Sequence, residues 1–169
     1  MTDFDAIKNK AKLLWATFGP FENVTGLAAP KLIEFAKVQS GDKVLDVGCG
    51  TGVVALTAAR VGALASGSDL TPELIEQATN NAKIAELDID FQVADVENLP
   101  YEDHSFDLVL SQFGHMFAPR PEVSTKEMLR VLKPGGVIAF STWPPELLTG
   151  RTFKLVSKYA PKPPKGASA

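Results

Sequence analysis

Three glycines at alternate positions, Gly48, Gly50 and Gly52, are the residues of this sequence that point most directly to chemistry. They follow the largely apolar run at residues 44–47 and precede a helical pattern. Glycine is required where the backbone turns tightly and a ligand presses against it. A bare turn gains little from three glycines, since each weakens a helix start by roughly 0.5–1 kcal/mol relative to alanine. The spacing therefore predicts a ligand-binding loop between a strand and a helix.

The same spacing argues against two common phosphate-binding loops. A dinucleotide fingerprint, G-x-G-x-x-G, would place its third glycine at position 53, which is Val53. No lysine follows the glycines as in a nucleotide-triphosphate loop. The ligand is therefore expected to be less anionic, and nicotinamide-dependent oxidoreduction is disfavoured.

Acidic residues stand near the ends of the predicted strands. Asp69 lies about 20 residues beyond the glycines, where an acid can accept hydrogen bonds from ribose hydroxyls. The alternative is a cap on the next helix, a role that suits Thr71 better. Asp95 follows the third strand and could accept from an exocyclic amine, or simply form a turn.

Short apolar runs alternate with amphipathic segments from residue 43 onward, which is typical of a doubly wound parallel sheet with an α/β, Rossmann-like fold. A helix stop and turn are expected at residues 133–136. The predicted strands are residues 43–47, 64–68, 90–94, 106–110 and 137–141; the predicted helices are residues 53–61, 72–86 and 122–132.

The first forty residues are predicted to form a helical cap on this core. Residues 3–18 show an apolar stripe at helical spacing, with Thr2 and Asp5 as a capping box, and residues 27–38 form a second helix. Trp15, Phe18 and Phe21 either shape an acceptor pocket or pack on the sheet. The core is assigned to residues 41–160, with a last helix at 146–159, and residues 161–169 to a disordered tail or linker.

Four motifs in order carry a resemblance to a known superfamily: VLDVGCGTG, the acid of GSDL, VADVENLPYEDHSFDLV and LRVLKPGG. Between Gly41 and Thr142 the chain resembles the class I S-adenosylmethionine-dependent methyltransferases, in particular the ubiquinone/menaquinone-biosynthesis branch. The resemblance implies a seven-stranded sheet ending in an antiparallel hairpin. It also implies in-line methyl transfer from S-adenosylmethionine to a small-molecule acceptor.

The resemblance carries cofactor-binding roles onto matching positions. The glycine loop, with Gly48, Gly50 and Gly52, would let the backbone approach the methionine part, and Asp46 would hold its ammonium group. The remaining roles are ribose binding by Asp69, adenine contacts by Leu70, Asp95 and Val96, and the sulfonium end for Ser111 and Gln112.

A fixed catalytic triad is not expected, because the methyl carbon is already activated and orientation is the main requirement. His115 is the candidate general base or substrate contact, with a packing histidine as the alternative. His104 lies in a polar run and is expected to be a solvated turn residue. The histidines and Cys49 lack a metal-ligand spacing, so no metal is expected and Cys49 is interpreted as a packing residue.

Composition limits the classes of partner. The chain has 169 residues, 45% apolar and 22% charged, which fits one domain with a sizeable core. A net charge of −3 gives no electrostatic support for binding nucleic acid or an anionic membrane. No run approaches the roughly 20 apolar residues of a membrane helix, and the N-terminus lacks signal-peptide features. A cytoplasmic protein with a small-molecule acceptor is expected.

The chain departs from the family after the fifth strand, because residues 143–169 cannot supply a helix and two further strands. Either the chain is a fragment or a partner replaces the hairpin. Residues 136–141 would then form an exposed sheet edge, through which we expect self-association and impaired catalysis. A methyltransferase-like binding module without turnover is the alternative function.

Overall fold

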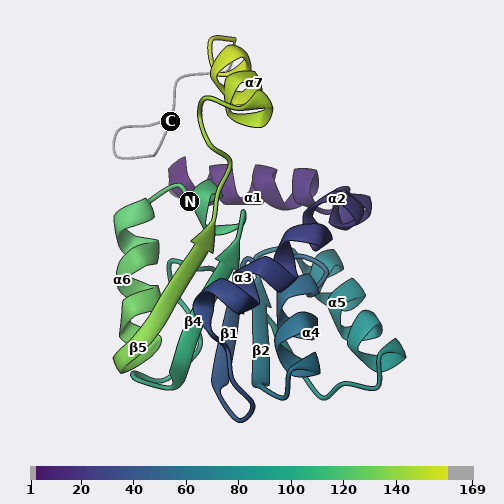
Figure 1. Cartoon of the computed structure of the whole chain (residues 1–169). Helices are drawn as coiled ribbons and strands as arrows, with labels where there is room; N and C mark the ends of the chain where they lie inside the picture. Colours follow the sequence, from purple (N-terminus) through teal and green to yellow (C-terminus); the bar gives the residue numbers. More distant parts are fainter. Residues whose placement is uncertain (1–2, 160–169) are drawn as a thin grey trace.

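The computed structural model describes residues 3–159 as a parallel sheet flanked by helices (Figure 1). The strands are β1 (Lys43–Val47), β2 (Leu64–Asp69), β3 (Asp90–Val93), β4 (Phe106–Gln112) and β5 (Leu132–Ser141). The α-helices are α1 (Asp3–Trp15), α2 (Glu22–Thr25), α3 (Ala29–Ala36), α4 (Val53–Arg60), α5 (Pro72–Ile84), α6 (Pro121–Val131) and α7 (Leu148–Val156). Short 3₁₀ turns are η1 (Gly19–Phe21), η2 (Gly26–Ala28) and η3 (His115–Phe117).

The sheet has five strands in the order β3-β2-β1-β4-β5, and every pairing is parallel. The chain moves outward in one direction from β1 to β3 and then returns to the other side with β4. This reversal between β1 and β4 is the switch point at which doubly wound sheets bind ligands, beyond the carboxyl ends of the strands. The predicted α/β, Rossmann-like fold class is confirmed.

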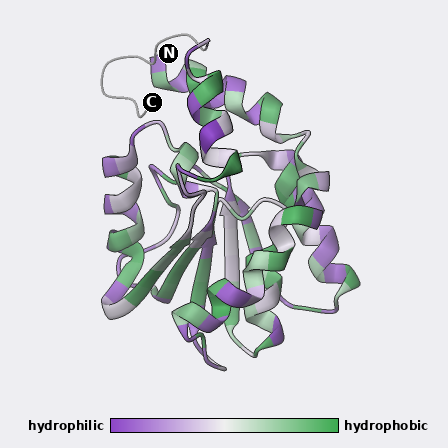
Figure 2. Ribbon diagram, turned by 45° about the horizontal axis from the view of Figure 1, so that its top comes forward, coloured by the Kyte–Doolittle hydropathy of each residue, from purple (hydrophilic) through white to green (hydrophobic). Residues whose placement is uncertain are grey.

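The central strands β1 and β4 are largely buried, as their short apolar runs predict, and hydrophobic residues predominate along the sheet in Figure 2. Val44 and Leu108 face α3 and α4 on one side, in a cluster that includes Leu32 and Val54. The opposite face packs against α6 through a second cluster. That cluster consists of Leu45, Val47, Leu99, Phe106, Val109, Met128, Val131 and Leu132.

The strand β5 begins five residues earlier than the sequence pattern predicts. Leu132 already pairs with Phe106, and regular pairing resumes with Val137 opposite Leu108 after a register shift. The expected turn at residues 133–136 is therefore a bulge inside the strand, with Gly135 at φ +80°.

The helices differ from expectation mainly at their ends. The first helix stops at Trp15 rather than at residue 18, and the second begins at Ala29 after short helical turns. The last helix, α7, covers Leu148–Val156 and projects beyond the carboxyl end of the sheet (Figure 1). The expected cap at Thr2 and the tail at 161–169 lie outside the described residues. Within residues 3–159, no helix is long and apolar enough to cross a membrane.

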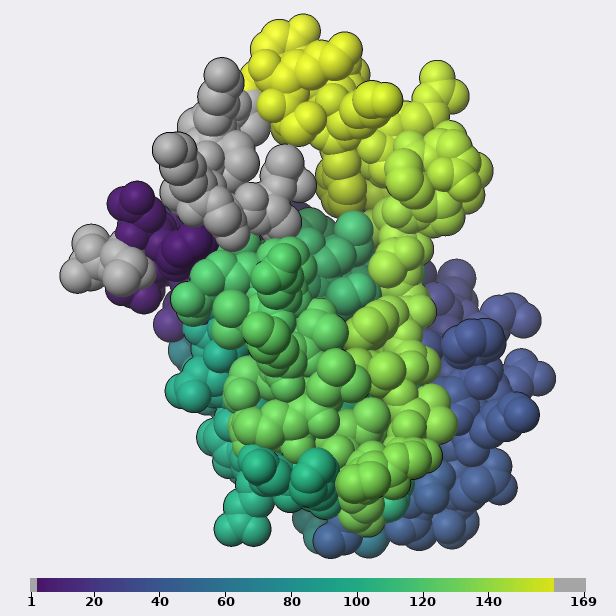
Figure 3. All heavy atoms as spheres, turned by 90° about the vertical axis from the view of Figure 1, so that its left-hand side faces the viewer, coloured from purple at the N-terminus to yellow at the C-terminus, as the bar shows by residue number. Residues whose placement is uncertain are grey.

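Five strands form the sheet in the described part of the chain, two fewer than the seven that the resemblance implies. β5 pairs with β4 on one side and is the outermost strand on that side, at the surface of the molecule (Figure 3). Val137 and Phe140 on it are 42% and 37% exposed. The described chain thus presents an apolar sheet edge.

Candidate functional site

A cavity of about 570 Å³ lies at the carboxyl ends of β1, β2 and β4, where the sheet changes direction. Its walls come from the glycine loop after β1, from the loops after β2, β3 and β4, and from α1 and η1. Helix α1 crosses over this end of the sheet (Figure 1). The cavity therefore lies where the sequence pattern predicts a ligand.

The glycine loop forms one wall of the cavity and has a backbone that favours glycine. Gly48, Gly50 and Gly52 have φ angles of +64°, +54° and +87°. A Cβ atom on Gly48 would lie 3.0 Å from the backbone of Gly114, whereas one on Gly50 would meet nothing within 4 Å. Gly50 thus leaves open space beside the loop. Gly52 lies outside the cavity wall and packs near Phe91 instead.

Asp46 lies on β1 at the base of the cavity and is fully buried. Its Oδ2 accepts a hydrogen bond from the backbone N–H of Ala55 at 3.1 Å, while its Oδ1 has no protein partner. Burial raises the pKa of Asp46 to about 7, the charge of Asp69 adds to this rise, and the Ala55 hydrogen bond opposes it. A buried carboxylate with a free oxygen can accept a hydrogen bond from a cationic ligand.

Asp69, at the end of β2, connects the glycine loop to the next helix. Its two carboxylate oxygens accept from the N–H groups of Gly50 and Thr71, both at 2.9 Å. Burial raises the pKa of Asp69, and these hydrogen bonds act against the rise. Thr71 precedes α5 as predicted, but its side chain makes no capping hydrogen bond. Asp69 therefore holds the backbone of Gly50 and Thr71 together while also lining the cavity, and it does not replace the missing cap.

Asp95 lines the cavity after β3 and is engaged in two contacts. One oxygen accepts from the N–H of Glu97 at 2.9 Å, as in a turn, and the other pairs with Nζ of Lys8 at 2.5 Å. Lys8 belongs to α1 and also bonds Glu97, which in turn pairs with Arg120. Lys8 and Glu97 were not predicted from the sequence, because their contacts join segments almost ninety positions apart.

The other predicted cofactor residues divide into two groups. Leu70, Val96 and Gln112 line the cavity, and Gln112 has a buried Oε1 without a hydrogen-bond partner. Ser111 lies behind the wall rather than in it. Its hydroxyl donates to the carbonyl of Val47 at 2.6 Å and accepts from the N–H of His115 at 3.0 Å, so it braces the loop after β4.

Aromatic side chains form a large part of the rest of the cavity wall. We call Trp15, Phe18, Phe113, Phe117, Trp143 and Phe153 the aromatic wall, since all line the cavity. Trp15 contacts both Phe18 and Phe117, with ring centroids 4.8 and 4.6 Å apart. Phe113 and Trp143 stack at 4.0 Å. Trp15, Phe18 and Phe21, for which the sequence left open either an acceptor pocket or packing on the sheet, all line the cavity.

The candidate base His115 lies outside the cavity wall. Its ring stacks on Phe140 at 4.1 Å, and its Nδ1 is buried without a hydrogen-bond partner. Burial lowers the pKa of His115. The geometry fits the packing role rather than general-base catalysis. His104 is exposed and lies in a turn at φ +56°, and Cys49 is buried with a raised pKa because of burial.

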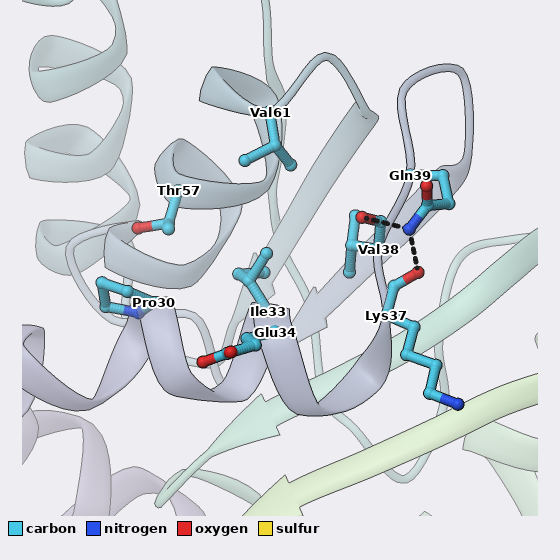
Figure 4. A pocket seen from close by; sticks show the side chains of 8 residues that line it. All are labelled: Pro30, Ile33, Glu34, Lys37, Val38, Gln39, Thr57 and Val61. Atoms are coloured by element: carbon cyan, nitrogen blue, oxygen red, sulfur yellow. Dashed lines mark hydrogen bonds between the residues drawn. The ribbon is translucent and has the colours of Figure 1, made fainter.

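A second depression lies between α3 and α4, on a different part of the surface (Figure 4). It is lined by aliphatic side chains such as Ile33 and Val61, with Glu34 and Lys37 at its margin. The side-chain amide of Gln39 donates to the carbonyl groups of Lys37 and Val38 there. These contacts cap the end of α3 and present no cluster of reactive groups.

Comparison with known families places most of the sheet in a described family. A family model described as a methyltransferase domain matches residues 45–140, which is more than half of the chain. This chain is a class I S-adenosylmethionine-dependent methyltransferase family member. The match spans the glycine loop, the three acids Asp46, Asp69 and Asp95, and β4.

The relatives of this methyltransferase-family chain are longer proteins. An uncharacterized protein of Mycobacterium tuberculosis is 39% identical over 86% of the chain and 53% of its own length. A ubiquinone biosynthesis O-methyltransferase of Coxiella burnetii is 36% identical over 66% of the chain and 48% of its own length. The chain therefore spans about half the length of these curated relatives.

A solved structure named as a cyclase, rather than as a methyltransferase, has the same fold. The cyclase SpnF is 32% identical, with a TM-score of 0.65 over 69% of this methyltransferase-family chain and 44% of its own.

Proposed function

We propose that the chain binds S-adenosylmethionine in the cavity and transfers its methyl group in line to a small-molecule acceptor. The observation that carries this proposal is the group of carboxylates around the cavity: Asp46, Asp69 and Asp95. Among the described residues that line it, Lys8 is the one basic residue, and it already pairs with Asp95. Nothing there neutralises a pyrophosphate, so a dinucleotide fits poorly.

The cofactor fits the chemistry of this wall. Its methionine part carries an ammonium group, and its sulfur is a cationic sulfonium. The free oxygen of Asp46 offers an acceptor to a cation, and the open space at Gly50 admits a ligand close to the backbone. We assign the ammonium to Asp46 and the backbone approach to Gly48 and Gly50.

The nucleoside part is assigned to the loops after β2 and β3. Asp69 would accept from ribose hydroxyls with lone pairs that Gly50 and Thr71 leave free. Leu70 would pack on the adenine. Asp95 and Val96 would recognise its edge, with Asp95 accepting a hydrogen bond from its amine. Gln112 would face the sulfonium end, while Ser111 supports the loop that carries it.

The cofactor, when bound, supplies a methyl group on a good leaving group. The chain then has to align the acceptor opposite the carbon–sulfur bond and to exclude water. Helix α1 and the aromatic wall close the cavity on the acceptor side. Since no histidine lines the described wall, we assign no histidine as a base for the acceptor. A small acceptor with an apolar, planar part suits this surface.

Calorimetric titration of the purified chain with S-adenosylmethionine, S-adenosylhomocysteine and NAD tests the proposal. Binding of the first two and not of NAD supports it. A chain that binds NAD as tightly, or binds none of the three, contradicts it. An isosteric Asp46→Asn variant serves as the site control and should bind the cofactor more weakly.

A binding module without methyl transfer is the second candidate. One observation favours it: a 32% identical neighbour with this fold is titled a cyclase, so the fold does not by itself specify methyl transfer. A methyltransferase would turn over the cofactor, whereas a binding module would not. Formation of S-adenosylhomocysteine with an acceptor pool would establish transfer, and tight cofactor binding without any product would favour the module.

A further inference from the structure

Helix α1 covers the cavity without being anchored in the core. None of its residues is buried, and Leu13 and Leu14 are largely exposed. Ile7, Lys8 and Ala11 nevertheless line the cavity. Trp15, at the end of the helix, packs against Phe18 and Phe117, so contacts at the other end must hold its first turns in place.

A group of charged side chains contacts the first turns of α1: Lys8, Asp95, Glu97 and Arg120. The Lys8 side chain is 11% exposed, and its ammonium contacts the carboxylates of both Asp95 and Glu97. The Glu97 side chain is 1% exposed and is also bonded by the Arg120 guanidinium at 2.7 Å. Arg120 lies 5.0 Å from the ring centroid of Phe4, one turn before Lys8 on α1.

Loss of Lys8 would affect Glu97 and Asp95 differently. Glu97 keeps Arg120 and its backbone N–H as partners if Lys8 is lost. Asp95 has Lys8 as its one ion-pair partner among the described residues and would keep the N–H of Glu97, with the charge of Arg120 nearby. A buried ion pair that loses one partner leaves the other charge uncompensated. Lys8 thus fixes the side chain of Asp95 as well as the helix.

We propose that Lys8 is a positioning residue that fastens α1 over the cavity and holds Asp95 oriented at its wall, with Glu97 as the buried anchor of the contact. The part that concerns Asp95 rests on the proposed function, since it places the cofactor's adenine there. The part that concerns α1 does not. Cofactor affinity is then coupled to the attachment of a helix that carries part of the acceptor side.

Hydrogen exchange of the cofactor-free chain tests the attachment of α1. In Lys8→Met, the amides of α1 should exchange roughly five-fold or more faster than in the wild type, while those of β1 stay protected. Lys8→Arg keeps the charge and should retain the protection. Lys10→Met, on the exposed face of the same helix, is the matched control and should match the wild type. Equal exchange in Lys8→Met and Lys10→Met overturns the proposal.

A double-mutant cycle on S-adenosylmethionine affinity tests the coupling. Lys8→Met should weaken binding roughly five-fold or more in the wild type and distinctly less in Glu97→Gln, because the two side chains act through one contact. Fully additive effects would show that Lys8 acts elsewhere and would overturn the coupling. A wild-type chain that does not bind the cofactor would refute the proposed function, and the exchange experiment would still decide the role of α1.

Discussion

Replacing Asp46 by asparagine should change how stability depends on pH. The substitution keeps the size of the side chain and its acceptor for the Ala55 N–H but removes the charge. Asp46 is fully buried, and this burial, more than the nearby charge of Asp69, raises its pKa to about 7. An ionised carboxylate at this position is therefore a cost that the folded chain bears and the unfolded chain does not.

The magnitude follows from the two pKa values of Asp46. An ordinary value of 3.8 in the unfolded chain and about 7 in the folded one differ by about 3, which corresponds to on the order of 4 kcal/mol. The folded state binds this proton more tightly, so the contribution is most favourable below pH 4. It is lost progressively as the pH rises from about 4 to 7. Between pH 5 and 8 the loss amounts to about 2–3 kcal/mol.

Urea unfolding of the wild type, Asp46→Asn and Asp88→Asn at pH 5, 6.5 and 8 measures this effect. The free energy of unfolding of Asp46→Asn relative to the wild type should rise by about 2–3 kcal/mol from pH 5 to pH 8. Asp88 is exposed, and its variant should follow the wild type at every pH. If Asp46→Asn also runs parallel to the wild type, Asp46 ionises like an ordinary carboxyl and the reasoning fails.

The same carboxyl should make ligand binding depend on pH. A cationic ammonium beside Asp46 favours its ionised form, so S-adenosylmethionine should bind more tightly as the pH rises through 7. Asp46→Asn should lose this dependence. A wild-type affinity that is flat from pH 6 to 8 would place the ammonium away from Asp46.

Three further predictions use other parts of the site and the sheet. Gly50→Ala puts a methyl group into the open space beside the loop, so calorimetry should find cofactor binding lost in a folded chain; undiminished affinity would move the ligand elsewhere. Asp69→Ala should weaken cofactor binding by on the order of 2–4 kcal/mol, whereas Asp103→Ala, in an exposed loop, should not; equal effects would contradict the assignment of the ribose. The apolar edge of β5 should produce dimers or larger species in sedimentation at micromolar concentration, and Val137→Lys should disperse them; a monomeric wild type refutes this expectation.

Local patterns in the sequence predicted the elements of the sheet well. β1 has the predicted bounds, Lys43–Val47, because a buried apolar run there is closed by a charged turn before it and by the glycine loop after it. β5 was harder, since the segment at residues 133–136 reads as a turn and nothing local shows that Leu132 already pairs with Phe106. Pairing partners of a bulged strand are set by the neighbouring strand.

The cavity wall was predictable to the extent that it follows strand ends. Asp46, Asp69 and Asp95 meet there because parallel strands deliver their carboxyl ends to one edge. The contact between Lys8 and Asp95 depends on how α1 lies across the sheet, which periodicity within α1 cannot reveal. Ser111 shows the opposite case: it lies near the carboxyl end of β4, as predicted for a site residue, but its side chain donates to the backbone of Val47.

The lack of any buried residue in α1 separates the surface that would choose an acceptor from the core that keeps the chain folded. Substitutions along this helix can reshape the cavity without opening voids between the sheet and its helices. In protein engineering, residues 3–15 are therefore a part of the chain that can be varied with little effect on the core, provided that Lys8 and its contacts with Asp95 and Glu97 are kept.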